Sequence, residues 1–218
     1  MAGQRVIVVD DHPLFREAVK QALLTAFPGI AIAEAGTLDA VSEILSHDSD
    51  YDLVLLDLKM PGVQGFSGLV YLRAEYPSVP VTVVSASEEA HLMRRAIDLG
   101  ASGYIPKSSN AETMKQAIAA VLRGDIWLPE DAGTRAGADS ESDQLARRLT
   151  TLTPQQLRVL MMLREGLLNK QIAYQLKVSE ATVKAHVSAI LQKLEVDSRT
   201  QAVIAAGRID GETVPNAG

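Results

Sequence analysis

Two adjacent carboxylates, and a third much further along the chain, follow short apolar stretches. Asp10 and Asp11 follow Val6–Val9, and Asp57 follows Leu53–Leu56. Close carboxylates repel one another, and each is driven towards its neutral form unless positive charge compensates. A divalent cation such as Mg²⁺ supplies that charge and prefers oxygen ligands. If the fold brings these residues together, they predict a site for Mg²⁺ (or Mn²⁺).

Two later apolar stretches lead to a hydroxyl and to an ammonium group. Ser85 follows Val81–Val84, and Lys107 follows Gly103–Ile105 in the sequence GYIPK. A hydroxyl can donate to a phosphoryl oxygen, and an ammonium group stabilises charge that develops during phosphoryl transfer. One carboxylate can then act as a nucleophile towards phosphorus and form an acyl phosphate. The residue types therefore predict phosphorylation of an aspartate.

The segments around these residues alternate between strand-like and helix-like patterns. Five such alternations predict a parallel α/β sheet with helices on both faces. Ligands bind such sheets beyond the carboxyl ends of the strands, where we expect the acids, Ser85 and Lys107 to meet. The second strand is expected at an edge of the sheet. The predicted strands are Val6–Val9, Ile30–Ala33, Leu53–Leu56, Val81–Val84 and Gly103–Ile105, and the predicted helices are 13–26, 37–46, 66–75, 88–99 and 110–122.

The motifs VVDDHP, LVLLDLKMPG, VVSAS and GYIPKS give residues 5–123 a resemblance to the receiver domain of bacterial response regulators, a flavodoxin-like doubly wound fold. By this resemblance Asp57 is the phosphoacceptor, and Tyr104 is an aromatic switch that turns inward when Ser85 moves. The resemblance implies that Ser85 and Lys107 hold the phosphoryl group. The metal ligands that it implies are Asp10 (through water), Asp11, Asp57 and the backbone carbonyl of Lys59. By contrast, three histidines lack metal-ligand spacing and are interpreted as surface or capping groups: His12, His47 and His91.

A change in composition and charge marks the end of this region. Residues 1–123 carry a net charge of −5, residues 124–149 carry −3, and residues 150–218 carry +2. The middle segment is rich in Gly, Ala, Asp and Ser and is interpreted as a linker with a short helix near its end. We therefore predict a receiver domain over 1–123, a linker over 124–149 and a separate domain over 150–218, whose basic charge suits a different partner.

The last region has the pattern of an all-α domain with four helices, at about 154–165, 169–176, 180–194 and 199–208. Ser179–Leu194 predicts an amphipathic helix whose inner face carries Val183, Val187, Ile190 and Leu194. The preceding helix and tight turn give helix-turn-helix form. Small residues and Lys184 on the outer face suit an approach to the DNA major groove.

The run from Leu152 to Val203 resembles the LuxR-type DNA-binding domain of NarL/FixJ response regulators. The resemblance implies that three residues of the recognition helix face the bases: Lys184, Ala185 and Ser188. It places five others near phosphates: Thr153, Asn169, Lys170, Thr182 and His186. The chain departs from the family at Leu168, where a small hydroxyl residue is common, and at Ser188, where some members have a basic residue.

Together these features predict a cytoplasmic transcription regulator of a two-component system, and not an enzyme beyond its own phosphotransfer and dephosphorylation. Its expected partners are a sensor histidine kinase, double-stranded DNA and, when phosphorylated, a second copy; no membrane is expected. One alternative is a Mg²⁺-dependent phosphotransferase or phosphatase with an Asp nucleophile, but Lys59 occupies the position where a second carboxylate is wanted. A DNA-binding protein with an inactive receiver is the other alternative. The absence of cysteine excludes thiol catalysis and disulfides.

Overall fold

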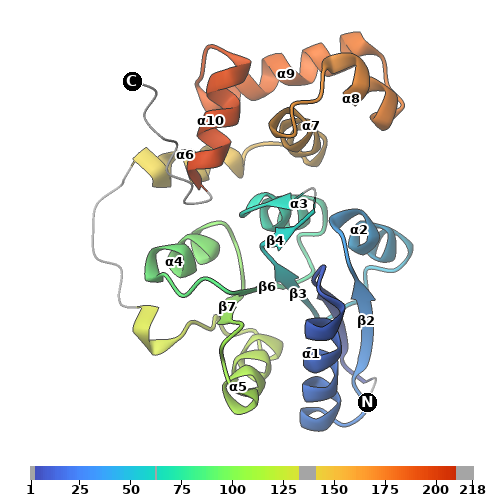
Figure 1. Ribbon diagram of the computed structural model, residues 1–218, viewed down its shortest axis with the longest axis vertical. Coiled ribbons are helices and arrows are strands. Elements are labelled where there is room, and N and C mark those ends of the chain that lie inside the picture. The colour runs from blue at the N-terminus through green and yellow to red at the C-terminus, as the bar shows by residue number, and fades with distance from the viewer. Residues whose placement is uncertain (1–2, 62, 133–140, 210–218) are drawn as a thin grey trace.

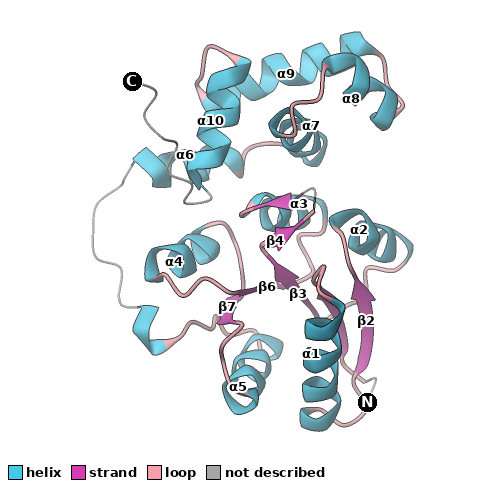
Figure 2. Ribbon diagram, in the orientation of Figure 1, coloured by secondary structure: helices cyan, strands magenta, loops and turns pink. Residues whose placement is uncertain are grey.

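The computed structural model describes residues 3–61, 63–132 and 141–209. Its N-terminal part contains one parallel five-stranded sheet, in the strand order β2-β1-β3-β6-β7 (Figure 2). The predicted strands and the edge position of the second are therefore confirmed, with ends that differ by one or two residues. The strands are β1 (Arg5–Val9), β2 (Ala31–Ala35), β3 (Leu53–Asp57), β6 (Val81–Ser85) and β7 (Gly103–Pro106).

Five helices cover the two faces of this sheet (Figure 1). Alternate side chains of a strand point to opposite faces, so β1 contributes to two cores. Ile7 and Val9 pack with residues of α2, α3 and α4, whereas Val6 and Val8 pack with residues of α1 and α5. The doubly wound architecture is thus as predicted. The helices are α1 (Pro13–Ala26), α2 (Leu38–His47), α3 (Ser67–Glu75), α4 (Ala90–Asp98) and α5 (Ala111–Leu122).

A short hairpin after β3 was not predicted from the sequence. β4 (Lys59–Met60) pairs with β5 (Val63–Gln64) in antiparallel fashion directly after Asp57. The buried side chain of Val63 lies so close to Gly68, near the start of α3, that a Cβ at Gly68 would be 2.9 Å from it. The hairpin therefore connects the end of β3 tightly to α3.

The start of the predicted linker is an extension of the sheet. The backbone N–H of Tyr104 donates to the carbonyl of Trp127 at 3.0 Å, and the N–H of Trp127 donates to the carbonyl of Ser102 at 3.1 Å. Gly103 permits this approach, since a Cβ there would lie 3.1 Å from the Trp127 oxygen. The following 3₁₀ turn, η1 (Glu130–Ala132), contacts α4, and its Ala132 carbonyl accepts a hydrogen bond from Arg94.

The C-terminal part is helical and contains α6 (Glu141–Leu149), α7 (Pro154–Arg164), α8 (Asn169–Leu176), α9 (Glu180–Leu194) and α10 (Arg199–Ile209). A capping box begins α7, because Thr153 accepts from the Gln156 N–H while the Gln156 side chain accepts from the Thr153 N–H. Val183, Ile190 and Leu194 bury the inner face of α9, as predicted. The short helix expected near the end of the linker is α6, which packs on α9 and α10.

The two parts of the chain are docked through α3 and α7 (Figure 1). Phe66 and Val70 of the receiver line a small pocket together with Leu157, Leu160 and Met161 of α7. The apolar cluster on this side of the sheet is continuous with the core of the helical domain. Burial of apolar surface therefore contributes to holding the domains together.

Candidate functional site

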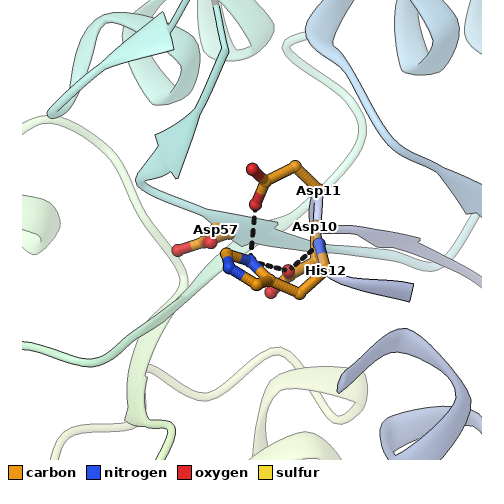
Figure 3. Close-up of side chains that lie close together, drawn as sticks. All are labelled: Asp10, Asp11, His12 and Asp57. Carbon is orange, nitrogen blue, oxygen red and sulfur yellow. Dashed lines mark hydrogen bonds and ion pairs between the residues drawn. The ribbon is translucent and has the colours of Figure 1, made fainter. Parts of the chain in front are cut away.

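The carboxyl ends of β1 and β3 bring three aspartates into one pocket (Figure 3). Parallel pairing of β1 with β3 places Val9 beside Leu56, so the residues that follow, Asp10 and Asp57, are neighbours. Both are buried, with 1% and 2% of their surface exposed. Ligand atoms of Asp10, Asp11 and Asp57 all lie within 4.8 Å of one another.

Lys107 supplies the positive charge in this pocket. Its Nζ lies 2.8 Å from Asp57 Oδ2 and 2.6 Å from Asp10 Oδ2. Burial of the ammonium group acts to lower its pKa, but the hydrogen bonds and charges of the two aspartates outweigh burial and raise the pKa of Lys107 above its ordinary value. The lysine is therefore held in its charged form beside the carboxylates.

Burial acts on the pKa of Asp57 in the opposite direction to its effect on the pKa of Lys107. Desolvation raises the pKa of Asp57 above its ordinary value, although Lys107 and the backbone N–H of Lys59 both act to lower it. That N–H donates to Asp57 Oδ1 at 3.2 Å. A further cation in the pocket would favour the ionised, nucleophilic carboxylate.

The donor set fits a hard divalent cation. Three carboxylates converge, and Mg²⁺ prefers such oxygen ligands while keeping waters that can exchange for a phosphate oxygen. Asp10 Oδ2 contacts the Lys107 ammonium group and Asp11 Oδ1 contacts the His12 ring, so each of these buried oxygens keeps a lone pair for a further ligand. These oxygens are thus available to a metal ion.

His12 also belongs to this cluster, a position that its spacing in the sequence does not predict. Its Nδ1 lies 2.7 Å from Asp11 Oδ1 and 3.3 Å from Asp10 Oδ1, and its backbone N–H donates to Asp10 Oδ1 (Figure 3). His12 is exposed and occupies the N-cap position of α1, as the sequence predicts. Its contact with the aspartates was not predicted, because spacing patterns do not show how the loop after β1 folds. His47, in contrast, hydrogen-bonds the Glu43 carbonyl in the last turn of α2.

Ser85 is the last residue of β6, and Tyr104 lies within the neighbouring strand β7. Ser85 is buried, and its Oγ accepts from the backbone N–H of Ser87 at 3.3 Å. The ring of Tyr104 is fully buried, and its hydroxyl donates to the Ser87 carbonyl at 2.8 Å. Desolvation is the main cause that raises the pKa of Tyr104. The tyrosine is thus already turned inward in this structure.

The outer face of α9 is accessible even though the domains are docked. Lys184, Ala185 and Ser188 are all exposed, and α9 lies on the side of the helical domain away from the sheet (Figure 1). Within the described residues Lys184 pairs with Glu180 of its own helix, at 3.4 Å, and the Ser188 hydroxyl donates to the Lys184 carbonyl. The three predicted base-facing residues therefore share one open surface.

The residues predicted near phosphates are divided between this surface and local structural roles. Lys170 is exposed and Thr182 lies in the first turn of α9, where its N–H donates to the N-cap Ser179. Asn169 begins α8 and accepts from Arg199 at 3.4 Å, and Thr153 caps α7. His186 is half-buried.

A phosphoacceptor-type pocket on a doubly wound sheet, joined to a helix-turn-helix domain, defines a response regulator with DNA-binding output. Residues 6–119 match the response regulator receiver domain, and residues 150–206 match the family of bacterial regulatory proteins described as luxR. The chain belongs to this family of two-component transcriptional regulators. The class is one of DNA-binding regulators and not of classical enzymes.

Relatives of known role match almost the whole chain. A glycerol metabolism activator of Pseudomonas putida is 43% identical over 94% of this chain and 96% of its own. The nitrate/nitrite response regulator NarP of Escherichia coli is 39% identical over 92% of this chain and 93% of its own. The fold is shared with the Salmonella typhimurium RcsB response regulator, with a TM-score of 0.55 and 22% identity over 95% of this chain and 100% of that one. Among the described helices, none has the length and apolar character that crossing a bilayer requires.

Proposed function

We propose that Asp57 accepts a phosphoryl group from the phosphohistidine of a sensor kinase. An oxygen of Asp57 forms the new bond to phosphorus while the bond from phosphorus to the kinase imidazole breaks, and the imidazole leaves. The observation that carries this proposal is the contact of the Lys107 ammonium with a buried carboxylate at the end of β3. Lys107 would stabilise the oxygens of the transferred group.

Three side chains and one backbone group would hold Mg²⁺ (or Mn²⁺) here: Asp11 and Asp57 directly, Asp10 through water, and the carbonyl of Lys59. When bound, the ion screens the negative charge of the phosphoryl group and the carboxylates. Ser85 would donate its hydroxyl proton to a phosphoryl oxygen. In doing so Ser85 would give up its hydrogen bond from the Ser87 N–H. The resulting movement of Ser87 would displace Tyr104, because the Tyr104 hydroxyl donates to the Ser87 carbonyl.

We further propose that residues 1–123 form the receiver, 124–149 the linker and 150–218 the DNA-binding domain. In DNA binding α9 would enter the major groove, with its base-facing and phosphate-facing residues as assigned by the resemblance. Because the target is DNA, the regulator would act in the cytoplasm. RcsB, which shares the fold, has been solved as dimers bound to DNA, which supports a homodimer here. We propose that phosphorylation favours this dimer. The same pocket would release phosphate by attack of water, so that the signal decays.

Phosphorylation is tested with acetyl phosphate and Mg²⁺, followed by electrophoresis in a phosphate-affinity gel. The wild-type chain should shift, and Asp57→Asn should not, while its circular dichroism stays that of the wild type. The control is Asp50→Asn, because the Asp50 side chain is 98% exposed and remote from the pocket. If the same fraction of Asp57→Asn as of the wild type shifts in the gel, the assignment of Asp57 as the phosphoacceptor is rejected.

A further inference from the structure

The turn between α8 and α9 contains a residue in an unfavourable backbone conformation. Lys177 has φ 55° and ψ 41°, the left-handed region that glycine or asparagine normally occupies at the end of a helix. A lysine side chain there brings its Cβ too close to the backbone carbonyl. The described part of the chain has five glycines with positive φ and only two other residues, Lys177 and Glu195. A lysine at this position therefore calls for an explanation.

Glu195 has a side-chain interaction that explains why a residue other than glycine adopts this conformation. It ends α9 with φ 55° and ψ 49°, nearly the same conformation as Lys177. Its carboxylate, however, forms an ion pair with Arg148 and so connects α9 to α6. Glu195 thus has an interaction within the protein that a glycine would lack.

Lys177 has no comparable interaction. Its side chain is exposed, and no hydrogen bond or ion pair of its ammonium group is found in the described part of the chain. Its backbone N–H makes the expected capping bonds to Ala173 and Tyr174, but any residue other than proline would make them. The end of α8 does favour a positive charge through the helix dipole. The experiment must therefore distinguish this structural role of Lys177 from binding of a ligand.

The position of Lys177 suggests a ligand for the free charge. Only Val178 separates it from Ser179, the N-cap of α9, whose N-terminal turns carry the open surface of Lys184 and Ala185. A helix that enters the major groove with its N-terminal end brings the preceding turn near the phosphates that border the groove. The ammonium group is long, flexible and suited to a phosphate.

We propose that Lys177 is a phosphate-binding residue of the DNA interface, and that this contact explains a lysine at a position suited to glycine. The inference rests on DNA binding by α9 as described above. It predicts that Lys177→Gly stabilises the helical domain and weakens its binding to DNA. Because the contact is to phosphate, the weakening should not depend on base sequence.

The experiment uses the full chain and a labelled duplex of mixed sequence, about two helical turns long, titrated between about 50 and 200 mM KCl. Lys177→Gln keeps the strained backbone and removes the charge. It should lower affinity about fivefold at 0.15 M salt and reduce the slope of log K against log salt by about 0.9, the values for one lost phosphate contact. Lys177→Gly should show the same losses together with a higher Tm.

The matched control is Glu195→Gly, which relieves the same backbone conformation away from the turn and should leave the salt slope unchanged. If Lys177→Gln has the wild-type affinity and slope, Lys177 serves only the end of α8 and the inference is overturned. A change in Tm without a change in slope would overturn it equally. If the wild-type chain, with beryllofluoride and Mg²⁺ present, does not bind the duplex, the proposed DNA contact of α9 fails and this inference with it.

Discussion

The guanidinium group of Arg158 in α7 lies 2.9 Å from the carboxylate of Asp39 in α2 and 6.0 Å from the centre of the Tyr71 ring in α3. This ion pair joins residues 119 positions apart and marks where the DNA-binding domain rests on the receiver. The Asp39 side chain is 84% exposed, and exposed ion pairs contribute on the order of 0 to 1 kcal/mol. Apolar contacts must therefore supply most of the docking energy.

Placing a charge at Met161 should therefore weaken the docking of the two domains, whereas removing the charge of Asp39 should not. Met161→Asp places a charge against Phe66 and Val70, where leaving it without a partner is costly. We expect this variant to separate the domains and raise the radius of gyration in small-angle X-ray scattering, whereas Asp39→Asn should leave the radius at its wild-type value. Affinity for DNA should be similar in both variants, because the face of α9 is already open. A large gain in affinity for Met161→Asp would show that docking hides the DNA surface.

The sequence predicted the sheet, its helices and the acidic pocket because these depend on local patterns. Alternating apolar runs and helix caps fix the elements, and the parallel sheet then places the ends of β1, β3, β6 and β7 on one rim. The contact of the exposed His12 side chain with Asp10 and Asp11, and the β4–β5 hairpin, depend on how loops fold, which periodicity does not encode. The α3–α7 contact was also missed, since an apolar helix residue such as Met161 looks the same whether it faces its own core or another domain.

Asp11→Ala should weaken Mg²⁺ binding, because it removes a proposed direct ligand. Loss of groups that only support metal ligands costs about 10- to 100-fold in affinity, so loss of a ligand should cost at least as much. Isothermal titration calorimetry with Mg²⁺ measures the change, and Asp50→Asn serves as the control. The metal-free variant should be no less stable than the wild type, since repulsion among carboxylates is relieved. Unchanged Mg²⁺ affinity would contradict the role of Asp11.

Leu168→Ser should stabilise the helical domain. Leu168 occupies the N-cap position of α8 with an extended backbone, no side-chain cap and 64% exposure. Its N–H is already bonded to the Gln171 side chain at 2.7 Å, so a serine would complete the reciprocal capping pair. The expected gain is about 1 kcal/mol in the free energy of unfolding, measured by urea denaturation. Leu168→Ala, which removes the exposed apolar side chain without adding a cap, should show little of this gain.

Lys184→Ala should weaken binding to a natural operator by about 1–3 kcal/mol and relax the preference at one base position if Lys184 reads a base. The side chain is free to do so, because its exposed pair with Glu180 is weak. If it contacts only phosphate, the loss should be uniform across sequences and the salt slope should fall by about 1. Competition binding with operator variants separates these results, and equal binding by variant and wild type would exclude both.

Trp127 should report activation from within the receiver. Its backbone pairs with β7 beside Tyr104, and its side chain packs against a cluster made of receiver residues. Beryllofluoride with Mg²⁺ mimics the acyl phosphate, and a displacement of Tyr104 would be transmitted to Trp127 through their shared hydrogen bond. We therefore expect a shift in tryptophan emission in the wild type. Because this is the only tryptophan of the chain, the signal has a single origin.

The controls locate the source of this shift. Asp57→Asn should show none, and neither should the wild type without Mg²⁺. In Met161→Asp, where the domains are expected to be apart, the shift should persist at its full size, because Trp127 is anchored to the receiver alone. If the shift disappears in that variant, the emission of Trp127 depends on the docked helical domain, and the linker responds to the domain interface instead of to β7.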